Sequence, residues 1–169
     1  MMEIKTRQEA IQALYNYSCF FDWSEFDKFR DDEEVAFYAI TKNPFNYKKL
    51  SKRLQRKDSI IIHALSRSGF MLRFMDRKIK RSKKYVLLAI KENGESIKYA
   101  IDLNDDLELA LEAVKQTHEA AYYLSSRFQD YIGRRNPEEA LMEFQRINNM
   151  KNELKDALKG QEKSQLRKI

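Results

Sequence analysis

The chain has 169 residues and contains few of the residues on which disulfide-stabilised, metal-binding and membrane-spanning proteins depend. A single cysteine, Cys19, excludes an internal disulfide framework. The two histidines, His63 and His118, stand far apart, and neither has a second ligand at a spacing typical of zinc sites. No apolar run approaches the length of a membrane span, and no segment has the composition of a secretory signal. We expect a soluble, cytoplasmic protein without a metal or cofactor.

Glycine and catalytic motifs are also scarce. Four glycines form no phosphate-binding loop, and no Gly-x-Ser-x-Gly motif is present. Acidic pairs such as Asp105-Asp106 stand at the starts of apolar runs, where negative charge favours the N-terminus of a helix. Cys19 stands among aromatic residues, which is typical of a buried, unreactive thiol. We therefore expect no enzymatic activity.

An alanine followed by Ile, Leu or Val recurs at nearly constant spacing through the middle of the chain. The intervals are 25, 25 and 24 residues, and apolar residues at helical spacing stand before and after each pair. A unit of this size cannot bury its apolar face alone, so neighbouring units must stack and share a core. The four pairs are Ala39-Ile40, Ala64-Leu65, Ala89-Ile90 and Ala113-Val114.

Each unit has a break between its two apolar runs, which predicts two helices. In Ser68-Gly69 and Asn93-Gly94, we expect the glycine to take the left-handed conformation that ends a helix. Asn43-Pro44 places a proline in the opening turn of the second helix. The fourth unit has Thr117-His118, so the sequence leaves open whether its two helices are fused.

The pattern predicts an all-α protein. We expect a short, right-handed-type helical repeat array (α-solenoid) of about four helix-turn-helix units, each of about 25 residues, with a capping helix at each end. The chain should form a single domain. Its predicted parts are an N-terminal cap over 1–30, repeats over 31–130, a C-terminal helix over 131–160 and a disordered basic tail over 161–169.

The two ends of the chain carry amphipathic patterns of their own. Residues 4–21 have apolar residues at helical intervals, which predicts the N-terminal cap. Asn136 and Pro137 mark the start of a helix that should run to about Lys159 and stop at Gly160. Its apolar stripe would either pack on the last repeat or form a dimer through residues 137–159. Packing on the repeat is favoured because a lysine interrupts the stripe. The stripe consists of Ala140, Phe144, Ile147, Leu154 and Leu158, with Lys151 between them.

Parts of the repeat region resemble a known family. Residues 34–43, and Tyr85 to Gly94 followed by Tyr99-Ala100, are similar to the bacterial and protist repeat family catalogued as domain of unknown function 4116. The resemblance covers roughly residues 31–130. It implies a repeated helical architecture and carries no activity and no functional residues with it.

Positive charge is concentrated in one block. Residues 48–84 hold 14 Lys and Arg against Asp58 and Asp76, so this block has a net charge of +12 within a chain of net charge +6. We expect the cations to lie on one face of the second helix of two consecutive units and to merge into a single patch with almost no local counter-charge. The candidate contact residues are Lys48, Lys49, Lys52, Arg53, Arg56, Arg73, Arg77, Lys80, Arg81 and Lys84.

A patch of this kind favours an anionic partner, because like charges in proximity destabilise the folded state until a counter-charge binds. We predict a non-catalytic protein that binds RNA, DNA or a nucleoprotein, with affinity that falls as salt rises. Phe45 and Phe74 could stack on unpaired bases, whereas the repeat positions of Tyr47 and Phe70 favour the core. A membrane partner is disfavoured because the basic helices bury their apolar faces.

Two alternatives remain open at this stage. The first is an adaptor or inhibitor directed at a protein, for example a small phage-type inhibitor that docks on a nucleic-acid-processing enzyme such as a CRISPR effector. The second is a solvated basic face without a partner.

Overall fold

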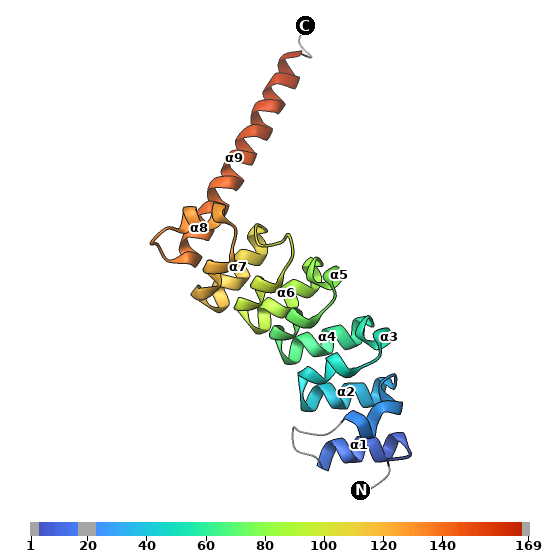
Figure 1. Cartoon of the computed structure of the whole chain (residues 1–169). Coiled ribbons are helices and arrows are strands. Elements are labelled where there is room, and N and C mark those ends of the chain that lie inside the picture. The colour runs from blue at the N-terminus through green and yellow to red at the C-terminus, as the bar shows by residue number, and fades with distance from the viewer. Residues whose placement is uncertain (1–3, 17–22, 167–169) are drawn as a thin grey trace.

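The computed structural model describes residues 4–16 and 23–166. Every regular element among these residues is a helix, which confirms the all-α prediction. The elements form an elongated molecule, with the two termini at opposite ends (Figure 1). The α-helices are α1 (Arg7–Asn16), α2 (Glu33–Lys42), α3 (Lys52–Gln55), α4 (Asp58–Arg67), α5 (Arg77–Lys80), α6 (Lys83–Glu92), α7 (Leu107–Gln116), α8 (Ser126–Ile132) and α9 (Pro137–Leu166). The 3₁₀ helices are η1 (Trp23–Phe29), η2 (Pro44–Lys49), η3 (Gly69–Phe74), η4 (Gly94–Tyr99) and η5 (His118–Tyr123).

The first apolar run of each predicted unit forms a ten-residue α-helix. These helices are α2, α4, α6 and α7, and each packs on the next in chain order. The alanine of each repeated pair is fully buried, because a small side chain lets neighbouring helices approach closely. One continuous hydrophobic core therefore runs along the stack, as the repeat pattern predicted.

The second half of each unit differs from the single helix that the sequence predicted. In the first two units it is a 3₁₀ helix followed by a separate four-residue α-helix, and the residue between them, Leu50 or Met75, is buried and extended. Ser51 follows Leu50, and its backbone N–H donates to the carbonyl oxygen of Arg30 at 2.7 Å. The equivalent bonds of later units join Ile101 to Lys80 and Ser125 to Asn104. Bonding to the preceding unit thus replaces the bonds that a continuous helix would make.

The glycines at the breaks do not take the expected left-handed conformation. Among the described residues, positive φ angles occur at Asp102 and Gly133 alone. Gly69 and Gly94 are required for a different reason: a Cβ on either would lie less than 3.0 Å from the carbonyl oxygen of Ala89 or Ala113 in the next unit. The break in the fourth unit, Thr117, is extended and separates α7 from η5, so these two helices are not fused.

The C-terminal helix α9 begins as predicted and ends later. Asn136 accepts hydrogen bonds from the N–H groups of Glu138 and Glu139, whereas Gly160 does not stop the helix, which continues to Leu166. The predicted disordered tail 161–169 is therefore helical as far as Leu166, and residues 167–169 lie outside the described part. Glycine in a helix interior costs about 1 kcal/mol relative to alanine, which is too little to end a helix by itself.

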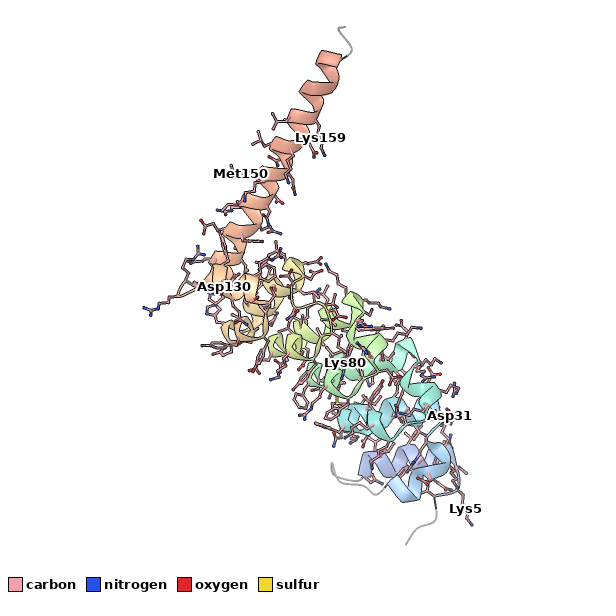
Figure 2. The ribbon with its side chains drawn as sticks, turned by 45° about the horizontal axis from the view of Figure 1, so that its top comes forward. Lys5, Asp31, Lys80, Asp130, Met150 and Lys159 are labelled. Carbon is pink, nitrogen blue, oxygen red and sulfur yellow. The ribbon has the colours of Figure 1, made fainter. Side chains whose placement is uncertain are left out.

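Helix α9 meets the stack only through its first turns. Ala140 and Leu141 are buried against α7 and α8, and Phe144 packs edge-on to Phe128 and Tyr131. From Ile147 to Leu158 the apolar side chains are exposed, and the helix projects away from the body of the molecule (Figures 1 and 2).

Helix α1 covers the other end of the stack by packing on α2. Ile4, Leu14 and Phe26 are buried, while Tyr15 is exposed and lies beside Tyr38. The remaining residues of the predicted N-terminal stripe, Ser18 and Phe21, and the cysteine at position 19 lie outside the described residues.

Candidate functional site

The structure divides the ten predicted contact residues between two kinds of element. Three lie on 3₁₀ helices and the other seven on or beside α3, α5 and α6, so the cations of each unit do not share one continuous helix. We call the second group the basic edge: Lys52, Arg53, Arg56, Arg77, Lys80, Arg81 and Lys84. The first group is Lys48 and Lys49 on η2 and Arg73 on η3.

The basic edge is continuous between the first two units. Arg56, which ends α3, lies 3.5 Å from the carboxylate of Asp76, which precedes α5. Helices α3 and α5 accordingly lie along the same side of the stack (Figure 1). The prediction that equivalent short segments of adjacent units stand next to one another agrees with this arrangement.

The prediction of almost no local counter-charge is wrong. Four of the ten cations form ion pairs with acids, of which two lie outside residues 48–84 and two are the acids within this block. These pairs are largely exposed, so each contributes little to stability and stays accessible to a competing anion. The pairs are Arg53–Asp31, Arg56–Asp76, Arg81–Asp102 and Lys84–Asp58.

One of these ion pairs belongs to an arrangement that occurs twice. Asp31 accepts hydrogen bonds from the hydroxyl of Ser51 and from the guanidinium of Arg53, at 3.0 Å for the latter. Asp105, Ser125 and Arg127 repeat this geometry in the fourth unit. The hydroxyl of Ser51 and then Arg53 lower the pKa of the Asp31 carboxyl. Arg53 therefore joins the start and the end of the first unit in the structure, whereas its role as a contact residue remains a prediction.

Lys80 also has a structural partner. Its ammonium group donates to the carbonyl oxygen of Arg73 at 2.7 Å. At the equivalent position of the first unit, the amide of Gln55 donates to the carbonyl oxygens of Lys48 and Leu50, and Gln129 does the same in the fourth unit. Lys80 therefore occupies a position whose side chain satisfies carbonyl groups at the end of the 3₁₀ helix.

The 3₁₀ helices carry a cluster of aromatic rings and cations on their outer surface. Phe45 is 46% exposed, and its ring lies 5.6 Å from that of Phe74. Phe70 is 5.8 Å from Phe74 and 5.4 Å from Tyr99. The Lys48 ammonium lies 4.4 Å from the centre of the Phe74 ring, within the range of a cation–π interaction.

The same pattern continues into the later units. Lys98 of η4 lies 5.5 Å from the ring of Tyr99 and 4.9 Å from that of Tyr123 on η5. Lys98 and Lys48 are related by the repeat, as are the rings of Tyr123 and Phe74 beneath them. We call this surface the 3₁₀ ridge: Phe45, Lys48, Lys49, Phe70, Arg73, Phe74, Lys98, Tyr99 and Tyr123.

Sequence reasoning missed the far half of this ridge. Lys98, Tyr99 and Tyr123 stand in the acidic part of the chain, and net charge alone gave no reason to select them. The available signal was the repeat register, in which positions 48, 73 and 98 are all cationic and positions 74, 99 and 123 are all aromatic. Tyr47, expected in the core, is buried and donates its hydroxyl to the carbonyl oxygen of Gln55 at 2.6 Å.

The two histidines occupy unrelated positions. His63 is on α4 and faces α2. Its ring lies 4.6 Å from that of Phe37, and its Nε2 atom lies 2.9 Å from the Thr41 hydroxyl. Burial lowers the pKa of His63. Within the described residues, no three His, Cys, Asp or Glu side chains gather as a metal site would require, and no helix is long and apolar enough to cross a bilayer.

Comparison with known families supports the repeat interpretation. Residues 58–103 and 82–129 each match the family described as Domain of unknown function (DUF4116). The resemblance to DUF4116 is confirmed for residues 58–129. The two DUF4116 matches share α6 and η4, whereas the first unit, which the resemblance was expected to include, lies outside both. No curated protein and no solved structure matches the chain.

Proposed function

We propose that this chain is a cytoplasmic, non-catalytic repeat protein of the α-solenoid type, which binds nucleic acid or a nucleoprotein through the cations of residues 48–84. One observation carries the proposal. In the part of the chain that the structure describes, six of the ten candidate cations have no acidic group within 4.0 Å. These are Lys48, Lys49, Lys52, Arg73, Arg77 and Lys80.

Surface cations without acidic partners are suited to phosphate groups. Phosphate binding requires positive charge along a surface and releases condensed counterions, so affinity falls steeply as salt rises. The exposed ion pairs of Arg53, Arg56 and Arg81 do not oppose this, because a phosphate can compete for a guanidinium that its partner holds weakly in solvent.

The test is a salt titration of the binding of labelled RNA and DNA, followed by charge reversal. Lys49→Glu and Arg77→Glu are the best variants, because both side chains are exposed and neither has an acidic partner among the described residues. Lys115→Glu is the matched control, since it makes the same charge change at an exposed position on α7. We expect Lys49→Glu and Arg77→Glu to bind more weakly and to lose affinity less steeply as the salt concentration rises, and we expect Lys115→Glu to change neither. Affinity that is independent of salt, or equally reduced by Lys115→Glu, would reject the proposal.

A protein-directed role is the second candidate, and the projecting part of α9 favours it. Met150, Leu154 and Leu158 are 68, 62 and 51% exposed, and apolar side chains gathered on one helix favour a protein contact. The two candidate occupants are a second copy of the chain, as in the predicted dimer through residues 137–159, and a larger enzyme that the protein inhibits. Light scattering of the purified chain distinguishes these two. A partner that co-purifies at fixed stoichiometry after nuclease treatment, and is lost in Leu154→Glu, would support the second.

A further inference from the structure

We propose that the 3₁₀ ridge binds a single strand of RNA or DNA by stacking unpaired bases against its aromatic rings. The inference rests on the proposed nucleic-acid binding and adds the form of the ligand and a second set of contact residues. It is drawn from the geometry of the ridge, because the basic edge by itself has no means of distinguishing single strands from duplexes.

Aromatic rings on the ridge are exposed to solvent. Phe45 and Tyr123 of the ridge are 46 and 38% exposed, although a repeat array has a core that can bury such rings, and Tyr122 beside the ridge is 79% exposed. Phe45 lies in a connected group with Phe70, Phe74 and Tyr99, in which neighbouring ring centres are 5.4 to 6.2 Å apart. A connected apolar patch of this kind on a highly charged protein indicates a contact surface.

Cations lie directly over the rings of the ridge. Lys48 and Arg73 lie over the rings of the ridge, and neither has an acidic partner among the described residues. Lys98 lies over Tyr123 and is also paired with Glu95 at 2.6 Å. Alternating rings and cations can contact bases and phosphates of one strand at the same time, which is how proteins bind single strands without sequence preference.

A paired duplex is not the preferred ligand of the ridge. The bases of a duplex are stacked on one another and show only their edges, so a ring on the protein has no base face to contact. The exposed area of the rings therefore contributes to binding only when the bases are unpaired. A single strand should gain from both the rings and the cations, and a duplex from the cations alone.

The test compares the affinities of a labelled 20-nucleotide poly(U) strand and a duplex of equal length, measured by fluorescence anisotropy at one salt concentration. Tyr123→Ala is the ridge variant. Tyr15→Ala is its matched control, because Tyr15 is also an exposed tyrosine with a lysine over its ring and lies on α1, which contributes no residue to the ridge. Tyr123→Leu is the second variant, since it keeps an apolar side chain and removes the aromatic face.

We expect Tyr123→Ala and Tyr123→Leu to weaken single-strand binding about tenfold, in line with the loss of one stacked base, and to leave duplex binding unchanged. Tyr15→Ala should change neither. Equal affinity of the ridge variants and the native chain for the single strand would overturn the inference, while a loss of binding in Arg77→Glu, which lies on the basic edge, would still uphold the proposed function. If the chain binds neither ligand, both proposals fail. Single-strand affinity that is equal to duplex affinity, or binding to anionic lipid vesicles in its place, also overturns the inference.

Discussion

Gly94 lies directly against the carbonyl oxygen of Ala113, so close that a Cβ at position 94 would approach this oxygen to less than 3.0 Å. Gly69 has the same relationship to Ala89 one unit earlier. The glycine of one unit and the alanine of the next therefore act as a pair that sets the separation between neighbouring helices. The first unit has Pro44 at this position and the fourth has His118, after which no further helix of the repeat type follows among the described residues.

We predict that Gly94→Ala destabilises the protein by about 1–3 kcal/mol, because the added methyl group must push α7 away from η4. Urea denaturation measures this change. Gly160→Ala is the control, since nothing lies within 4 Å of its Cβ position, and it should leave the free energy of unfolding of the body unchanged. A stability loss in Gly94→Ala no larger than that in the control would show that the stack adjusts freely at this contact.

Ser96 and Asn46 occupy equivalent positions in two units, and we expect opposite effects from replacing them by alanine. The Ser96 hydroxyl is buried without a hydrogen-bond partner in the described part of the chain, so Ser96→Ala should raise stability by up to about 1 kcal/mol. The Asn46 amide donates to the carbonyl oxygen of Ala39 at 2.8 Å, so Asn46→Ala should lower stability by about 1–3 kcal/mol. Thermal unfolding of both variants tests this prediction, and melting temperatures that shift in the same direction would contradict it.

Acidification should destabilise the contact between α2 and α4 through His63. The Thr41 hydroxyl donates to the carbonyl oxygen of Phe37 at 2.8 Å and therefore accepts from Nε2–H of a neutral His63. Because burial lowers the pKa of His63 in the folded state, the unfolded chain binds the proton more readily. The contribution of His63 is thus fully present above its ordinary pKa and is lost as the pH falls below that value.

The measurement is the free energy of unfolding from pH 7.5 to pH 5 for the native chain and for His63→Gln, which keeps a donor near Thr41 and does not titrate. We expect a steeper loss of stability in the native chain over this range. Parallel profiles of the two proteins would show that His63 has no part in the pH dependence.

The projecting part of α9 should contribute nothing to the stability of the repeat body. Removal of residues 150–169 should leave the melting temperature within about 2 °C, because the side chains described there are exposed. Phe144→Ala should lower stability by roughly 1–3 kcal/mol, since this ring packs on Phe128 and Tyr131. Calorimetry compares the two. A truncated chain that melts as early as Phe144→Ala would show that the outer turns of α9 contact the body or a second copy.

Much of the fold could be predicted from the amino-acid pattern, because the repeat units present it four times. The spacing of the buried alanines located α2, α4, α6 and α7, and Asn136 correctly located the start of α9. The structure of the second half of each unit was harder to predict from the sequence. Leu50 and Met75 continue a helical apolar pattern, yet both are extended, and the backbone N–H that follows Leu50 bonds to the preceding unit.

The candidate site was only partly predictable for the same reason. The ten cations could be selected from their local charge, but which of them pair with an acid could not, and two of the four acids, Asp31 and Asp102, lie outside this block of the sequence. Asp58 at the start of α4 and Lys84 on α6, for example, are brought together only because these helices of adjacent units pack on each other. The rings of Tyr99 and Tyr123 join the candidate surface through the same packing.

The sequence by itself determined the unit length, the buried helix of each unit and the excess of positive charge in one block, since each depends on residues that are close along the chain. Only the tertiary structure decided why glycine is needed at positions 69 and 94, which cations keep an acidic partner, and which rings remain at the surface. Those features depend on distances between neighbouring units, and these distances are fixed by packing across the stack.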